Sequence, residues 1–423
     1  MLSVLGWLTA LAFLAWAVHL VVLEGYLYEI AGNFLGDFTR TAELGAPTWF
    51  TGTGMFYGPI FVLEYRFLFA PQIMLPGDFA RLDFVLFGVA FACVWLALIG
   101  PRRPALATFV LAAWLAHHMS VEAFANTAHL EILELAFIAI ALLLATRGHA
   151  FAAGASLGLA IATKVLPGLF LPYLAITRKW QLFVSSALAA AIPFVATCWI
   201  QGISLWDGAS SLVYQGGNLT KLVYSEYEYT PRAEIARALA GEGGTVTADQ
   251  ARLAIGIHFV IALVTLAAVA WFLSRTRIPR SRYGLFFGLI GAVMLIVAPS
   301  AHAPYYIFLL PGLTAIFAAA LAMPFGMRGM AVWISLTVAY VFTGFDQVFF
   351  AMQRLFGFGL VVPQHWLAWH LPTIGLLLTL GTLIALLRRP RHVLATDESE
   401  DRPSLRLDPY PTFVAESGRA LLP

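Results

Sequence analysis

Asp37, in the stretch GNFLGDFTRTAELG, is one of the residues of this sequence that are suited to acid–base chemistry. A carboxylate that is partly shielded from water can take a proton from a hydroxyl group and so act as a general base. Arg40 follows three residues later, and on one helical turn the two side chains could pair. Asp37 could instead cap a short helix by accepting backbone N–H groups, and the spacing alone leaves both roles open.

Other polar side chains fall in or beside apolar segments, where desolvation is costly and a functional hypothesis is warranted. Lys164 interrupts the run ATKVLPG with no acidic residue near it in sequence, so it is either a solvated helix end or the partner of an anion. His302 lies in SAHAPYY beside Tyr305, which reads equally well as a site or as a polar turn with aromatic anchors. The spacing of His117, His118 and His129 matches no standard metal site, and we expect no metal and no cofactor.

The composition indicates which elements must position these residues. The 423-residue chain is 60% hydrophobic and 11% charged, against about 25% charged in an ordinary soluble domain. Its mean hydropathy is +0.82, and apolar runs of about 18–22 residues recur, the length that crosses a bilayer. The sequence therefore predicts an all-α polytopic membrane protein. Cys93 and Cys198 both lie inside apolar runs and indicate neither a disulfide framework nor a metal cluster.

The apolar runs predict about twelve transmembrane helices. The first lacks the charged start and cleavage site of a signal peptide, so we expect a retained helix. The predicted spans lie near residues 2–23, 82–100, 104–118, 128–146, 151–163, 166–177, 181–201, 252–273, 283–299, 305–322, 329–344 and 366–387. Several are shorter than the ~20 residues that cross a bilayer, and Lys164 and Pro167 break the run that contains the fifth and sixth.

The short connections separate by charge. GPRRP, TRGHA, TRKWQ, SRTRIPRSR, FGMRG and RRPRH together hold 13 Lys and Arg and no Asp or Glu. The positive-inside rule places these six connections, and both termini, in the cytoplasm. The protein is accordingly expected in the plasma (inner) membrane as a multi-pass protein, with Asp37 on the outer face.

Four longer segments then face outward, at residues 24–81, 117–130, 202–251 and 345–365, and loops of this length are uncommon unless they have a function. The first includes MFYGPIFVLEYRFLFAP, which we interpret as an amphipathic piece on the outer interface. No internal repeat and no nucleotide-binding glycine pattern occurs in the sequence. We expect one transmembrane catalytic domain, 1–393, and a disordered cytoplasmic tail, 394–423.

Taken in order, three stretches resemble glycosyltransferase family 87, the polyprenyl-phosphate-mannose-dependent α-mannosyltransferases of the integral-membrane GT-C class. They are GDFTRTAELG with the following FYGPIFVLEYRFLFAP, the segment from AHLEILEL to LPYLAITRKWQ, and SAHAPYYIFLLPGL. The resemblance covers roughly residues 1–390 and is most specific over 129–180. It implies that a single outer-loop Asp is the general base, which matches Asp37, and that a late outer-turn His lies near the donor, which matches His302. The D-x-D or E-x-D pair of related GT-C enzymes is absent from this loop, which puts metal dependence in doubt.

A transferase on the outer face needs a lipid-carried sugar, because sugar nucleotides stay in the cytoplasm. We expect transfer of a hexose, in the first place mannose, from a polyprenyl-phosphate donor to a lipid-linked or glycan acceptor. The leaving phosphate needs fixed cations, for which the candidates are Lys164, His302, Arg40 and Lys221. Further substrate contacts are expected from Tyr57, His129, Glu131 and Tyr305. A transporter or flippase, with broken helices and repeats, and a ligase that moves a whole lipid-linked glycan are the alternatives.

Overall fold

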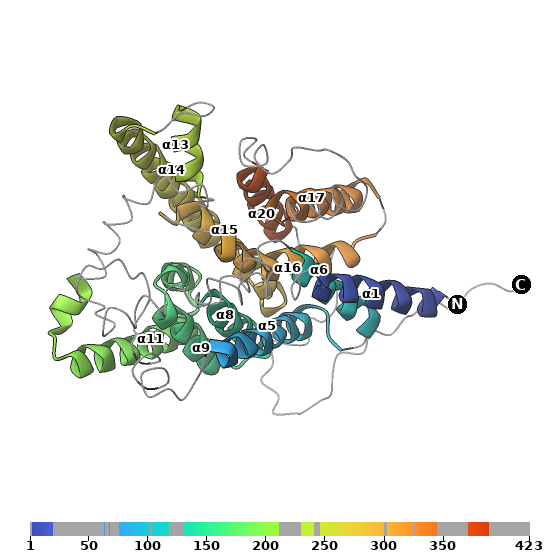
Figure 1. Cartoon of the computed structure of the whole chain (residues 1–423), viewed down its shortest axis with the longest axis horizontal. Helices are drawn as coiled ribbons and strands as arrows, with labels where there is room; N and C mark the ends of the chain where they lie inside the picture. The colour runs from blue at the N-terminus through green and yellow to red at the C-terminus, as the bar shows by residue number, and fades with distance from the viewer. Residues whose placement is uncertain are drawn as a thin grey trace, which may run out of the picture. The chain divides into compact units, whose positions relative to one another are not determined.

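The structure is a computed structural model, and the regular elements of its described residues are all helices (Figure 1). It describes residues 2–19, 63, 67, 76–101, 103–117, 120, 130–210, 230–240, 246–299, 303–324, 326–344 and 371–388. The described residues all belong to one compact unit, Met1–Arg389. The expectations for Asp37, Arg40, Tyr57, His129, Lys221 and His302, for most of the interfacial stretch and for the tail fall outside the described residues.

A helix occupies each of the twelve apolar runs. The α-helices are α1 (Leu2–His19), α5 (Pro76–Leu98), α6 (Pro104–Ala116), α8 (Glu131–Thr146), α9 (Ala150–Thr163), α10 (Phe170–Ile176), α11 (Trp180–Gln201), α13 (Pro231–Ala240), α14 (Ala248–Ser274), α15 (Tyr283–Val297), α16 (Leu310–Leu321), α17 (Met327–Gly344) and α20 (Leu371–Arg388). Three short 3-10 helices accompany them: η3 (Leu166–Leu169), η5 (Arg280–Arg282) and η6 (Ala303–Leu309).

Two of the predicted spans are not continuous α-helices. The run 166–177 begins as η3 and continues as α10, and the run 305–322 lies in η6 and α16. Each α-helical part begins close to a proline, Pro167 in the first case and Pro311 in the second. Proline lacks an N–H and clashes with the preceding turn, so it favours the first positions of a helix. Helix α13, inside the predicted outer segment 202–251, was not expected from the apolar pattern.

Length and composition support a membrane location. Among the described residues, four helical stretches are long and apolar enough to cross a bilayer: Trp180–Gln201, Ala248–Ser274, Arg280–Val297 and Leu371–Arg388. Shorter apolar helices accompany them, including Pro104–Ala116 and Ala150–Thr163. Helices in such number and of such composition indicate a multi-pass membrane protein.

Helix α15 lies at the centre of the packing, and α14 faces outward. Every residue of α15 from Tyr283 to Ile296 is buried, and the helix contacts α14, α16 and α20. Helix α14 also contains a long apolar stretch but exposes Phe259, Leu263 and Val264. A helix that is hydrophobic all round and exposed on one side is suited to lipid as its solvent.

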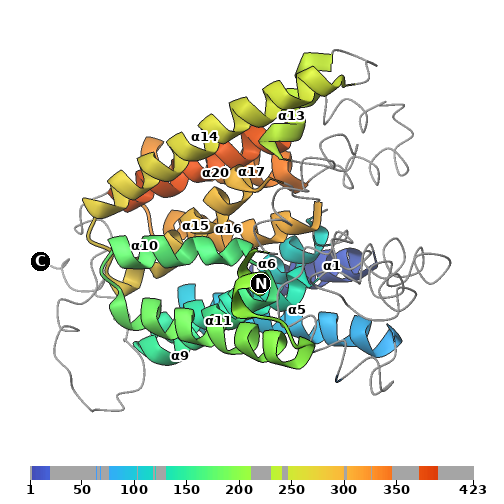
Figure 2. The ribbon, with the colours of Figure 1, turned by 90° about the vertical axis from the view of Figure 1, so that its left-hand side faces the viewer.

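Small residues let α9 approach α11 closely (Figure 2). Gly154 and Gly158 form a GASLG motif in α9. A Cβ on Gly154 would lie 2.6 Å from the Leu182 carbonyl oxygen, and one on Gly158 would lie 2.6 Å from the Ala189 Cβ. This is the close helix contact that a G-x-x-x-G spacing allows in membranes. It fixes α9, whose last residue is followed by Lys164.

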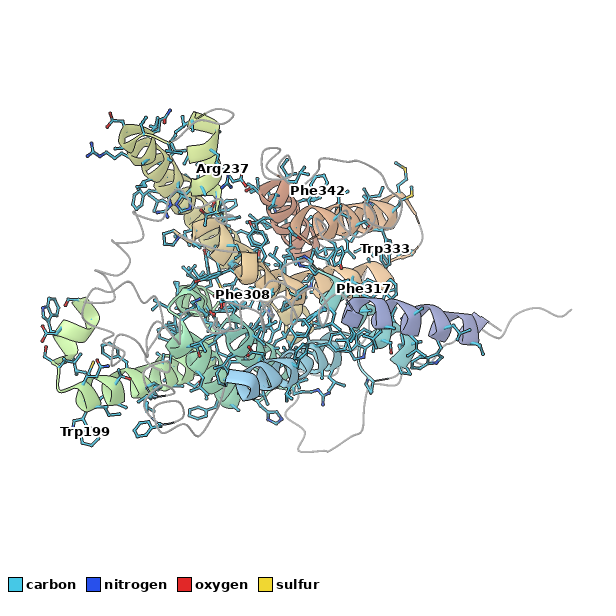
Figure 3. All side chains as sticks on the ribbon, viewed as in Figure 1. Trp199, Arg237, Phe308, Phe317, Trp333 and Phe342 are labelled. Atoms are coloured by element: carbon cyan, nitrogen blue, oxygen red, sulfur yellow. The ribbon has the colours of Figure 1, made fainter. Side chains whose placement is uncertain are left out.

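Aromatic contacts join the later helices. Phe317 of α16 and Trp333 of α17 point toward each other, with ring centroids 5.4 Å apart in an edge-to-face arrangement (Figure 3). Trp114 of α6 donates a hydrogen bond of 2.9 Å to the hydroxyl of Thr314 in α16. Trp199, near the end of α11, is 82% exposed instead, as expected of an aromatic residue that contacts lipid or its interface.

Basic connections meet at one end of these helices. A Cβ on Gly148, in the turn after α8, would lie 2.9 Å from Nη1 of Arg280. Lys179, between α10 and α11, donates a hydrogen bond of 3.0 Å to a main-chain carbonyl in the same connection as Arg280. Arg282 donates one of 2.9 Å to the carbonyl of Leu387, at the end of α20. Three of the six connections predicted to share one side of the membrane, and the end of α20, are therefore close together.

Candidate functional site

The site is built on the helical hairpin of α8 and α9. Gly148 has a φ of +87°, the left-handed conformation that glycine adopts without strain, and it ends α8. The N–H groups of Gly148 and His149 bond back to Ala145 and Leu144 over 3.1 and 2.9 Å. The chain then reverses into α9, which packs against α8.

This hairpin brings two distant charged residues together. Glu131 lies 17 residues before Gly148 and Lys164 lies 16 residues after it, so antiparallel helices of matching length place them side by side. Lys164 Nζ donates a hydrogen bond to Glu131 Oε1 within a salt bridge. Both residues are buried, with exposed fractions of 4% for Lys164 and 0% for Glu131. At about 1.5 Å per residue, α8 separates this pair from the basic turn by about 24 Å.

Lys164 also contacts an aromatic ring. Its backbone is extended at the end of α9, and Nζ lies 4.2 Å from the ring centroid of Tyr305 in η6. The negative face of a phenol ring attracts an ammonium group. Tyr305 follows His302 by only three residues, so the segment that carries the predicted donor-side histidine leads directly to this contact.

A second carboxylate, Glu134, completes the cluster. It lies one helical turn after Glu131 in the first turn of α8 and is 0% exposed. Neither of its carboxylate oxygens has a hydrogen-bond partner among the described residues. Glu131 and Lys164 are near enough to interact with it electrostatically. We refer to Glu131, Glu134, Lys164 and Tyr305 as the buried polar cluster.

Electrostatics make the buried polar cluster costly to maintain. Removing an ion from water costs several kcal/mol, and attraction between ions offsets this only when the geometry is good. The positive end of the α8 dipole favours carboxylates in its first turn, yet two carboxylates and one ammonium leave a formal charge of −1. Ionisable groups at membrane depth are expensive and usually functional. This cluster is therefore the candidate site.

The structure corrects one interpretation of Lys164. The solvated helix end is wrong, because Lys164 is buried and its anionic partner is Glu131. Sequence reasoning named Glu131 and Tyr305 separately without pairing either with Lys164, and it gave Glu134 no role in the site. The hairpin contains the missing signal, since the Glu residues and Lys164 lie at nearly equal distances from a glycine turn.

Other expectations concern metals and thiols. His117 is buried and shares a hydrogen bond of 3.2 Å with the Thr343 hydroxyl. That hydroxyl donates to the Ala339 carbonyl over 2.7 Å, so Nε2 of His117 is the donor in the bond to Thr343. In the part of the chain that the structure describes, no three His, Cys, Asp or Glu side chains gather in a metal-binding arrangement. Cys93 and Cys198 are free thiols.

The helices and the buried polar cluster define a multi-pass membrane protein with an ionised site inside its helical bundle. The model of glycosyltransferase family 87 matches residues 56–299, more than half of the chain. The chain therefore belongs to glycosyltransferase family 87, which confirms the resemblance and makes it a glycosyltransferase with a sugar donor and an acceptor. The matched region contains Glu131, Glu134 and Lys164, whereas Asp37, His302 and Tyr305 lie outside it. A search of curated protein sequences finds no match to the chain.

Proposed function

We propose that this protein transfers a hexose, in the first place mannose, from a polyprenyl-phosphate donor to a lipid-linked or glycan acceptor at the outer face of the plasma membrane. In this proposal about twelve transmembrane helices form a GT-C catalytic domain over residues 1–393, and residues 394–423 are a cytoplasmic tail. The observation that carries the proposal is the buried polar cluster, at the end of the α8–α9 hairpin away from the basic connections.

The position of the cluster favours a lipid-carried donor. Connections rich in Lys and Arg are retained in the cytoplasm, and Gly148 of the α8–α9 turn lies against Arg280 in one of them. About 24 Å of helix α8 separates that turn from Glu131, so the cluster belongs toward the other face of the membrane. Sugar nucleotides are confined to the cytoplasm, and a site near the outer face is therefore suited to a polyprenyl-phosphate sugar.

Lys164 is the proposed ligand of the donor phosphate. The phosphate gains negative charge as the bond to the sugar breaks, and a fixed cation in a water-poor site stabilises that charge strongly. The salt bridge to Glu131 and the Tyr305 ring hold the ammonium group in place before the donor arrives. His302, Arg40 and Lys221 are proposed as further phosphate contacts, and Tyr57, His129, Glu131 and Tyr305 as substrate contacts.

Asp37 is proposed as the general base. Attack on C1 of the sugar requires removal of a proton from the acceptor hydroxyl, and a carboxylate partly shielded from water has the basicity for this step. The proton passes to the carboxylate as the new glycosidic bond forms, and the bond between C1 and the phosphate oxygen breaks. The polyprenyl phosphate leaves with the bonding electron pair.

The test is a reconstituted transfer reaction. Purified protein in liposomes is given polyprenyl-phosphate mannose and a lipid-glycan acceptor, and the release of polyprenyl phosphate is followed together with the mannosylated product. Equal amounts of both products would support the proposal. Movement of the intact donor across the bilayer without its cleavage would favour the flippase, and transfer of a complete glycan would favour the ligase.

A further inference from the structure

Glu134 is a buried carboxylate to which the proposed reaction assigns no task. Its side chain is fully buried, and both oxygens lack hydrogen-bond partners among the described residues. It does not cap its own helix, because the N-terminus of α8 has no side-chain cap. Buried polar groups in proteins are nearly always hydrogen-bonded, and each exception requires an explanation.

Hydroxyl donors would satisfy Glu134. A carboxyl group has two oxygens that accept hydrogen bonds in either protonation state, and a buried one that lacks partners is costly. The sugar of a polyprenyl-phosphate donor carries several hydroxyl groups on adjacent carbons. We infer that Glu134 binds hydroxyl groups of the donor sugar and so contributes to the choice of sugar. This inference rests on the proposed function and deepens it.

The neighbours of Glu134 argue against other ligands. Oε1 of Glu131 already accepts a hydrogen bond from Lys164, so Glu131 is held by the cation while Glu134 keeps both oxygens available. A phosphate is attracted by the Lys164 ammonium group and not by the Glu134 carboxyl group, so the two side chains bind different parts of the donor. The phosphate lies toward the ammonium group, and the sugar, which is covalently attached to that phosphate, lies toward the carboxylate.

The sharpest test removes a hydroxyl from the donor and the carboxylate from the protein in turn. Four donors are prepared in which the 2-, 3-, 4- or 6-hydroxyl of polyprenyl-phosphate mannose is replaced by hydrogen. Hydrogen bonds to charged groups contribute about 1.5–3 kcal/mol, so kcat/KM of the unmodified protein should fall about 10- to 150-fold for at least one deoxy donor. In Glu134→Ala that same deoxy donor should be used nearly as well as the complete one. In Glu134→Gln, whose neutral amide still bonds a hydroxyl group, the loss caused by the missing hydroxyl should be smaller than in the unmodified protein.

Two controls separate sugar binding from a structural role. Ser156→Ala removes a hydrogen bond of 2.8 Å to the Phe137 carbonyl, on the same helix one turn beyond Glu134. Ser156→Ala should leave unchanged the loss of kcat/KM that a deoxy donor causes, because Ser156 bonds to α8 and is not proposed to contact the donor. Should Glu134→Ala fail to fold, the isosteric Glu134→Gln removes the charge but keeps a neutral hydrogen bond, and it should show a reduced loss for that deoxy donor.

The outcomes are distinguishable. If the unmodified protein transfers mannose but both Glu134 variants retain the full penalty for every deoxy donor, the role of Glu134 is refuted and the proposed function stands. If the unmodified protein neither binds nor uses polyprenyl-phosphate mannose, the proposed function and this inference both fail. Loss of the penalty in the Glu134 variants alone supports the inference.

Discussion

Replacement of Lys164 by Met should destabilise the protein and abolish transfer. The variant leaves the Glu131 carboxylate buried without its salt bridge, and removal of one partner of a buried ion pair costs about 3–5 kcal/mol. The unfolding entropy of a protein is about 2.1 cal/mol/K per residue. For the 389-residue unit Met1–Arg389 the total unfolding entropy is therefore about 0.8 kcal/mol/K. The midpoint of thermal unfolding should therefore fall by about 4–6 °C.

A double variant shows whether the salt bridge causes this loss. In Lys164→Met/Glu131→Leu both charges are absent, and apolar side chains of similar size are often no less stable than a buried ion pair. Most of the lost stability should return, although Glu134 still lacks a cation and full recovery is not expected. Thermal unfolding in one detergent, followed by the fluorescence of a fused reporter, measures all variants alike.

Activity and a matched control complete the experiment. Lys179→Met removes a lysine that also meets an aromatic ring, with Nζ 5.1 Å from the ring centroid of Tyr283, but at the basic end of the helices. It should cost no more than about 1.5–3 kcal/mol, the value of its charged hydrogen bond, and it should retain transfer. Lys164→Met should lose a hundredfold or more in transfer, as for removal of a donor that stabilises transition-state charge. Strictly additive stability losses in the double variant would refute the pairing. Recovery of transfer there would show that Lys164 only balances Glu131.

Three further outcomes are expected. Asp37→Asn should abolish transfer without loss of expression or of thermal stability, and an active Asn variant would exclude the general-base role. Transfer should persist in excess chelator, and loss with recovery on added divalent cation would contradict this expectation. Gly158→Ala forces a methyl group against α11 and should lower the free energy of unfolding by about 1–3 kcal/mol. Gly381→Ala should not lower it, because no neighbouring atom lies within 4 Å of the added Cβ. Equal effects of the two variants on the unfolding midpoint would count against the close α9–α11 contact.

The helices were predictable because lipid imposes a simple pattern. A spanning segment must satisfy its backbone polar groups internally and present apolar side chains, so hydropathy alone located α11 and α20 to within a few residues. The 3-10 starts at η3 and η6 were not predicted, because they depend on local backbone geometry near Pro167 and Pro311. Helix α13 was missed for a different reason: it is polar, and it packs on α14.

The site was predictable residue by residue but not as an arrangement. Glu131 and Lys164 are 33 residues apart, and charge, hydropathy and motif comparison treat each position by itself. Glu131 and Lys164 come into contact only because the chain reverses direction at Gly148. Lys164 was recognised as costly in an apolar run, and Glu134 was among the outer-side polar residues that called for a functional hypothesis, but no role was assigned to it. Its burial, with neither oxygen bonded to a described residue, is what distinguishes it.

The hairpin links the sidedness of the chain to its chemistry. The charges of the connections predict one common side for the turn at Gly148 and for the connection that holds Arg280. The contact between these two residues brings both segments together, on evidence that does not depend on the positive-inside rule. A helix of 16 residues, about 24 Å long, then places Glu131 well away from that end. Because a soluble sugar nucleotide would reach the basic end first, the role that we propose for Lys164 at the opposite end agrees with the proposed lipid-carried donor.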